Sequence, residues 1–131
     1  MKNKNKFLGF LISIFFIVSM TSSLAANAAN TSDTYWLAGN SYCRYKADAS
    51  SVYVKNSSLI YSVKVSIYGE HSATATAHNL IGPNTENIII SPNTTVYIPQ
   101  YCNEWGYEYL YIVFEVYGDG YASGVWSPDS I

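Results

Sequence analysis

The sequence predicts an all-β fold, an antiparallel β-sandwich or small barrel of about six to eight strands. Apolar and polar residues alternate with a period of two in several segments, which is typical of half-buried strands. Clusters of glycine, proline, asparagine and serine separate these segments about every ten residues. Helical periodicity is almost absent. These observations together indicate one β-domain of roughly one hundred residues.

The clearest alternation lies in the segment YSVKVSIYG. Its odd-numbered positions from Tyr61 to Ile67 are apolar, and its even-numbered positions are mostly polar up to Tyr68. Residues 69–72, GEHS, have the composition of a turn. Residues 73–78, ATATAH, alternate again, so the sequence predicts a hairpin whose second strand is 73–78.

The longest alternating segment is 107–117, YEYLYIVFEVY. Its even-numbered positions from Leu110 to Val116 form a predicted core face. Gly118-Asp119-Gly120 then predicts a hairpin turn, because glycine adopts positive φ without strain. The remaining expected elements are a final strand at 121–126, shorter strands at 50–56, 87–91 and 94–99, and a frayed segment at 30–33.

The first 28 residues have the pattern of a secretory signal peptide. Lys2, Lys4 and Lys6 precede the apolar run FLGFLISIFFIVSM, and Ala26-Asn27-Ala28 is an A-x-A cleavage site. We therefore expect a signal peptide at 1–28 and a single secreted domain at 29–131, with a cut after Ala26 as the alternative. The expected location is extracellular or associated with the cell wall, without membrane insertion after cleavage, because no second apolar span follows.

The chain after residue 28 is acidic. It carries four basic and nine acidic residues, a net charge of −5. A domain of this charge is a poor binder of phosphate backbones, which argues against nucleic acid and anionic membranes as partners.

Two cysteines, Cys43 and Cys102, remain after the predicted cleavage. An exported chain meets an oxidising environment, which favours one disulfide between them. In the chain-entropy model, closing a loop of this length stabilises the fold by about 4 kcal/mol. The alternative is a pair of buried free thiols, because the sequence does not show whether the two side chains face one another.

Tyrosine is the most unusual feature of the composition. All 13 tyrosines follow the predicted cleavage site, and Phe114 is the single phenylalanine there. Tyrosine is favoured where one end of the ring is apolar and the other is wet, as on a binding surface. The alternative is cross-strand aromatic packing that stabilises a two-sided sheet. The candidate binding residues are Tyr107, Tyr109, Tyr111, Tyr117 and Tyr68, and Tyr97 and Tyr101 are candidates to extend this surface.

Catalytic signatures are absent from the sequence. It has no nucleophile elbow, phosphate-binding loop or dinucleotide motif. Glu70 and the only histidines, His71 and His78, are a weak metal signal, and solvent-facing side chains are the favoured interpretation. Glu108 and Glu115 fall on opposite strand faces, which argues against a glycosidase pair. The sequence therefore predicts no enzyme, no metal and no cofactor.

The chain ends on SGVWSPDSI. Trp126 has the character of a core residue, Pro128 stops the last strand because it lacks a backbone donor, and Asp129 is a candidate cap for backbone amides. This ending, with SSVYVKNSS, VKVSIYG and YIPQYCNEWGYEYLYI, resembles a group of small secreted proteins of Gram-positive, Firmicutes-type bacteria of unassigned function. The resemblance covers about residues 44–130 and implies the compartment and the fold class.

The function expected from the sequence is a secreted, non-catalytic binding module. The tyrosines make a glycan or another cell-envelope component the favoured partner. A secreted inhibitor or bacteriocin-like effector that acts on a protein is the alternative. A third interpretation is an envelope protein that self-associates through exposed strand edges.

Overall fold

A computed structural model describes residues 30–74 and 76–130, so the predicted signal peptide lies outside the described residues. The all-β prediction is confirmed by eight strands in the described residues. Within those same ranges no helix has the length and apolar character needed to cross a membrane. The strands are β1 (Thr34–Leu37), β2 (Ser41–Tyr45), β3 (Val52–Asn56), β4 (Ser62–Glu70), β5 (Ile88–Ile90), β6 (Thr94–Ile98), β7 (Tyr109–Tyr117) and β8 (Ser123–Ser127).

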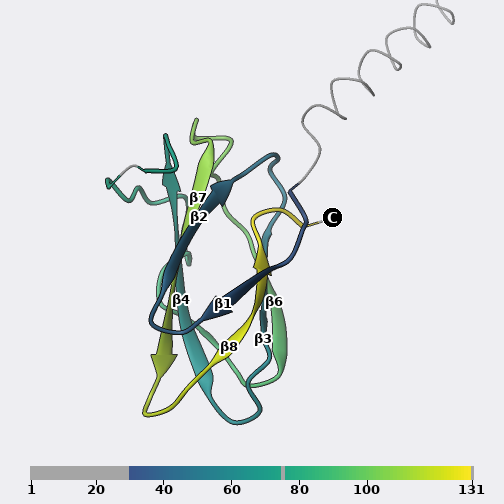
Figure 1. Ribbon diagram of the computed structural model, residues 1–131. Coiled ribbons are helices and arrows are strands. Elements are labelled where there is room, and N and C mark those ends of the chain that lie inside the picture. Colours follow the sequence, from purple (N-terminus) through teal and green to yellow (C-terminus); the bar gives the residue numbers. More distant parts are fainter. Residues whose placement is uncertain (1–29, 75, 131) are drawn as a thin grey trace, which may run out of the picture.

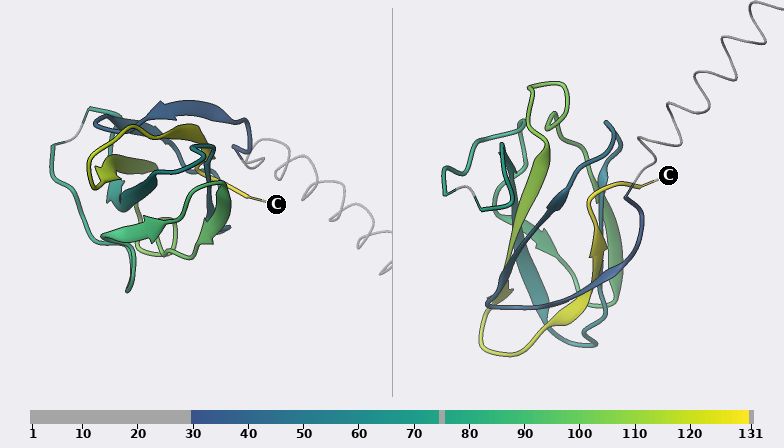
Figure 2. Two further views of the ribbon diagram at one scale, coloured as in Figure 1. Left: turned by 90° about the horizontal axis from the view of Figure 1, so that it is seen from below. Right: turned by 45° about the horizontal axis from the view of Figure 1, so that its top comes forward.

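The strands form two antiparallel sheets that pack face to face as a sandwich, without closing into a barrel (Figures 1 and 2). Sheet A has the order β1-β8-β3-β6, and sheet B has the order β2-β7-β4-β5. Successive strands lie in different sheets except for β4 and β5, which are neighbours in sheet B. This order is that of an eight-stranded jelly roll.

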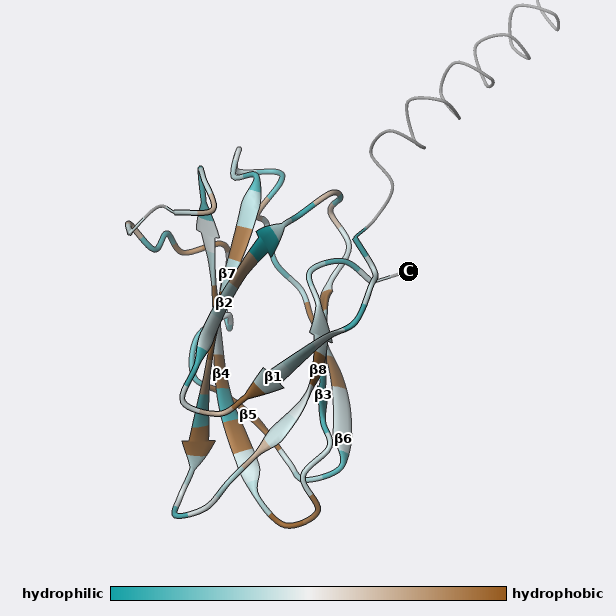
Figure 3. Ribbon diagram, in the orientation of Figure 1, coloured by the Kyte–Doolittle hydropathy of each residue, from teal (hydrophilic) through white to brown (hydrophobic). Residues whose placement is uncertain are grey.

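The core lies between the two sheets, and the period-two pattern of the strands explains its composition. Leu110, Ile112 and Phe114 on β7 are fully buried, as the alternation predicts. Trp36 on β1 and Trp126 on β8 face them from sheet A. The Trp36 and Phe114 rings stack with centroids 4.4 Å apart. Hydrophobic colour accordingly alternates along the strands in Figure 3.

The hairpin expected after β4 is wrong. The described residues between 73 and 78 form no strand. An isolated bridge pairs Asn79, which follows them, with Gly69 of β4. Alanine and threonine give the segment a period of two, but they offer little apolar surface to bury. Glu70, expected in a turn, is instead the last residue of β4.

The turn at 118–120 also differs from its prediction. Gly118 has a positive φ of 98°, as expected of a tight turn, but the turn forms no hairpin. It carries the chain from β7 in sheet B to β8 in sheet A. Strands β1 and β2, which the sequence analysis did not predict, are the outer neighbours of β8 and β7 respectively.

The two ends of the described chain meet at one end of the sandwich (Figure 1). The Asn30 amide donates to Asp129 Oδ2 at 2.6 Å, and the Asp129 amide donates to the Asn30 carbonyl at 3.4 Å. Arg44 donates to the Ser32 carbonyl at 2.8 Å and to the Asn30 side chain at 2.7 Å. The segment expected to fray is therefore held on both sides.

Candidate functional site

Four tyrosines form two adjacent cross-strand rows on the outer face of sheet B. We call Tyr45, Tyr68, Tyr109 and Tyr111 the tyrosine face. Tyr109 on β7 lies opposite Tyr45 on β2, with ring centroids 5.8 Å apart and the rings edge to face. Tyr111 lies opposite Tyr68 on β4, with centroids 6.3 Å apart. The tyrosine face exists because β7 points its odd-numbered residues outward while its even-numbered residues fill the core.

A histidine that the sequence analysis assigned to solvent belongs to this surface. The His78 ring stacks on Tyr111 with centroids 4.1 Å apart and planes 9° apart, and it lies 5.7 Å from the Tyr68 ring. The bridge between Gly69 and Asn79 brings it there, through hydrogen bonds of 2.8 and 3.2 Å. The loop after β4 therefore adds a fifth ring to the tyrosine face.

Glu70 is a buried carboxylate beneath this loop. Its Oε1 atom contacts His78 Nδ1, and its Oε2 atom has no hydrogen-bond partner among the described residues. A buried carboxylate is costly unless it is paired, so the contact with His78 stabilises the loop against β4. Within residues 30–74 and 76–130, no three His, Cys, Asp or Glu side chains come together as a metal site.

Polar groups surround the tyrosine rings. The Tyr68 hydroxyl donates to Glu86 at 2.9 Å; burial raises the pKa of Tyr68, and the bond to Glu86 raises it further. Lys64 and Glu115 form an ion pair at 2.7 Å farther along the same sheet face. The surface thus combines flat apolar rings with hydrogen-bonding groups at their edges, an arrangement suited to an uncharged polar ligand.

The structure does not bring all the predicted binding residues together. Tyr107 precedes β7 and packs against the core, where the chain turns at Gly106 with a positive φ of 86°. Tyr117 is exposed at the opposite end of β7. Tyr97 lies on β6 in sheet A, and Tyr101 stacks on Trp105 in the loop after β6. Tyr45 was not predicted as a binding residue because β2 was not recognised as a strand. Arg44 takes an inward-facing position there, so the segment lacks the usual alternation of apolar and polar residues.

A family model described as a protein of unknown function, DUF2712, matches residues 21–130. The chain belongs to the DUF2712 family. The searches of curated proteins and of solved structures give no match. The family match includes all the residues of the tyrosine face.

The predicted disulfide is wrong in this DUF2712 domain, because both cysteines are free thiols. Cys43 lies on the outer face of β2, opposite Tyr111, whereas Cys102 belongs to the buried core. The Cys102 thiol lies 3.4 Å from the Tyr109 carbonyl oxygen. No bridge between Cys43 and Cys102 is therefore present in the described residues.

The end of the DUF2712 chain is part of the fold. Trp126 is fully buried, Pro128 is buried, and Asp129 lies fully buried after β8. Besides the Asn30 amide, Asp129 accepts hydrogen bonds from the backbone amides of Ala47 at 2.9 Å and Asp48 at 3.3 Å. It also forms an ion pair with buried Lys46. These residues fasten the chain end to the β2–β3 connection.

Proposed function

We propose that this protein is an exported, non-catalytic binding module that recognises a cell-wall or other extracellular glycan through the tyrosine face. The observation that carries the proposal is the contiguous set of rings across β2, β7 and β4. Sugar rings have apolar C–H faces that stack on tyrosine, while their hydroxyls bond to the phenol groups at the ring edges. The exposed Tyr45 ring and the half-exposed Tyr109 ring beside it support the proposal of both kinds of contact.

The sequence supports the cellular setting of this proposal. The lysines, apolar run and A-x-A site of residues 1–28 have the pattern of an export signal. With the resemblance to exported proteins of Gram-positive bacteria, this pattern makes the cell wall the first glycan to test. The jelly roll also occurs in lectins, which supports sugar binding by analogy of fold.

The test is a pull-down of the purified protein with insoluble bacterial cell wall and, separately, with cellulose and chitin. We expect saturable binding that a soluble fragment of the same glycan competes away. Tyr45→Ala and Tyr109→Ala should abolish binding, while Tyr109→Phe should retain most of it because the ring remains. Tyr35→Ala is the matched control, since Tyr35 is 59% exposed on the outer face of sheet A.

Full binding by folded Tyr45→Ala and Tyr109→Ala variants would remove the tyrosine face from the site. Circular dichroism and melting temperatures establish that each variant is folded. Absence of binding to all three polymers would contradict glycan recognition itself.

A secreted inhibitor or effector that acts on a protein is the second candidate. The stacked pair of Tyr101 and Trp105 favours it, because the rings lie 5.4 Å apart on a loop and are 46% and 54% exposed. Exposed tryptophan and tyrosine often dominate the energy of protein interfaces. This candidate expects inhibition of a target enzyme or of bacterial growth, loss of that effect in Trp105→Ala, and no affinity for cell walls.

A further inference from the structure

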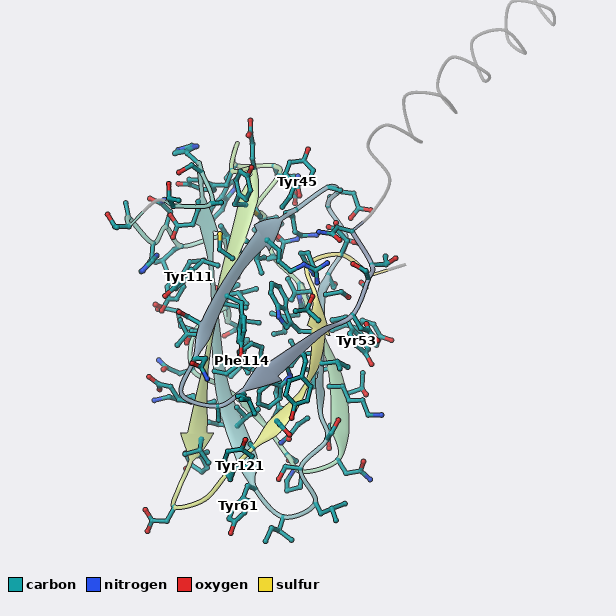
Figure 4. All side chains as sticks on the ribbon, in the orientation of Figure 1. Tyr45, Tyr53, Tyr61, Tyr111, Phe114 and Tyr121 are labelled. Carbon is teal, nitrogen blue, oxygen red and sulfur yellow. The ribbon has the colours of Figure 1, made fainter. Side chains whose placement is uncertain are left out.

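A second aromatic site lies on the outer face of sheet A, beside the meeting point of the chain ends. It is an open pocket of about 200 Å³. Two tyrosines, Tyr53 and Tyr97, line it together with the acids Asp33 and Asp129 and several hydroxyl side chains. Figure 4 shows Tyr53 and Tyr111 on opposite outer sides of the sandwich, with Phe114 between the sheets. The pocket is therefore separate from the tyrosine face.

The two tyrosines form angled walls. Tyr53 on β3 lies opposite Tyr97 on β6, with ring centroids 5.6 Å apart and planes inclined by 56°. The Tyr97 side is open to solvent, since Tyr97 is 58% exposed. The face of a tyrosine ring carries negative electrostatic potential, so the exposed Tyr97 ring and the adjoining Tyr53 ring attract a cation placed over them.

The charges around the pocket favour a cation as well. Asp33 is exposed, and none of the lining residues is basic. Lys46 pairs with Asp129, whereas Asp33, the other acid of the lining, forms no ion pair within 4 Å among the described residues. Arg44 is close to Asp33, but it faces the interior, with its guanidinium 5.4 Å from the Trp126 ring centroid. The net charge of −5 on the described residues adds a long-range attraction for cations.

The pocket is also preformed. One wall is the segment around Thr31 and Asp33. Arg44 fixes this segment by hydrogen bonds to the Ser32 carbonyl and the Thr34 hydroxyl. Its other wall, after β8, is fixed by the hydrogen bonds of Asp129. A ligand therefore binds without first ordering these segments, which lowers the free-energy cost of association.

We infer that this pocket binds an organic cation, a methylated ammonium group carried on a short apolar or hydroxylated stem. Tyr53 and Tyr97 contact the methyl groups, and Asp33 supplies the counter-charge. A methylated ammonium suits these walls better than a primary ammonium, which is strongly hydrated and loses more solvation in a partly apolar pocket. The inference does not depend on the glycan proposal, because the two sites share no residue.

The test compares choline with 3,3-dimethylbutan-1-ol, which has the same shape without the charge. Amide NMR spectra of the purified protein are recorded during titration with each compound. Choline should shift the amides of residues 31–33, 53, 97 and 127–130 saturably, with a Kd of about 1 mM or tighter. The neutral compound should bind at least about tenfold more weakly. Equal binding of the two compounds, or no saturable choline shifts at these amides, would overturn the inference.

Variants separate a local contact from a general charge effect. Asp33→Asn should weaken choline binding about tenfold, whereas Asp119→Asn, which removes an exposed charge from the 118–120 turn, should leave it unchanged. Tyr97→Phe should bind choline as the parent protein does, and Tyr97→Ala should lose binding. Equal effects of Asp33→Asn and Asp119→Asn would show a response to net charge alone and would refute the site. Tyr109→Ala should leave choline binding intact, so this result is independent of the tyrosine face.

Discussion

Lys46 and Asp129 form an ion pair between residues 83 positions apart, and both side chains are fully buried. Lys46 also donates to the Ser50 carbonyl at 2.6 Å. Removing one member leaves the other charge buried without its partner, which typically costs about 3–5 kcal/mol. The pair therefore couples the end of the chain to the β2–β3 connection.

Replacing Lys46 should consequently destabilise the protein far more than replacing an exposed lysine. Lys46→Met should lower the free energy of unfolding in urea by about 3–5 kcal/mol. Lys64→Met, which breaks the exposed pair with Glu115, should lower it by less than about 1 kcal/mol. The double variant Lys46→Met/Asp129→Asn should cost less than the sum of its single changes. Equal losses in the two lysine variants would contradict a buried role for Lys46.

The two buried tryptophans should respond differently to truncation. Trp36 Nε1 donates to the Lys55 and Val125 carbonyls, at 3.2 Å each, whereas Trp126 Nε1 has no partner among the described residues. Trp36→Phe therefore loses hydrogen bonds that Trp126→Phe does not, and it should cost about 1 kcal/mol more. Trp126→Ala should still cost about 3–5 kcal/mol, because the whole ring is buried. Urea unfolding followed by circular dichroism measures all three, and an unchanged melting temperature for Trp126→Ala would show that the ring is not part of the core.

The thiols should react slowly and unequally. Burial raises the pKa of Cys43, with a further contribution from Glu70, and burial raises the pKa of Cys102 to about 12. Because only the thiolate is nucleophilic, iodoacetamide should label Cys43 slowly at neutral pH and faster as the pH rises. Cys102 should react only after unfolding. Mass spectrometry of the unreduced, denatured protein should find two labels, and a mass lower by two hydrogens with no label would indicate a disulfide instead.

Cys102 should also make stability depend on pH in the alkaline range. Its pKa in the folded protein is raised from the ordinary 9.0 to about 12, so the unfolded chain releases this proton first. The stabilisation is complete below pH 9 and is lost as the pH rises toward 12. Cys102→Ala should flatten the decline of the free energy of unfolding in that window, and an unchanged slope would rule Cys102 out as its source.

The pair of Glu70 and His78 should control the loop after β4. His78→Ala removes the partner of a buried carboxylate and should cost about 1–3 kcal/mol. The same change in a Glu70→Gln background should cost less, because no buried charge is left unpaired. Hydrogen exchange at the Gly69 and Asn79 amides, which bond across this loop, provides a local measure. Equal costs in both backgrounds would show that the two side chains are not coupled.

The period-two pattern was sufficient to predict much of the fold. The alternation in β7 places Leu110, Ile112 and Phe114 in the core and the tyrosines outside, and the structure agrees. It failed at residues 73–78, where alternation occurs without large apolar side chains. It also failed at β2, because Arg44 faces the interior and is satisfied there by the segment 30–34. Local composition does not show such distant partners.

The residues of the candidate sites are also brought together by strand pairing between distant parts of the sequence. Tyr109 and Tyr111 were placed on one face by the strand pattern, but the contribution of Tyr45 and His78 follows from the register of β2 and from the return of the loop after β4. The disulfide was predicted only from the expected oxidising compartment. The direction of the Cys43 side chain depends on β2, a strand that was not predicted. Tyr53 and Tyr97 are 44 positions apart and meet only through the pairing of β3 with β6.

The contact between Asn30 and Asp129 brings together the two ends of the described residues 30–130. A short flexible linker joining the two ends would preserve every strand pairing, and new ends could then be opened in the exposed turn at residues 118–120. Such a circular permutant would exchange the sequential order of β7 and β8 for a direct connection from β8 to β1. A tag or surface attached through the new chain ends would then lie away from Tyr53 and Tyr97. Binding assays could therefore use an immobilised protein whose pocket stays accessible.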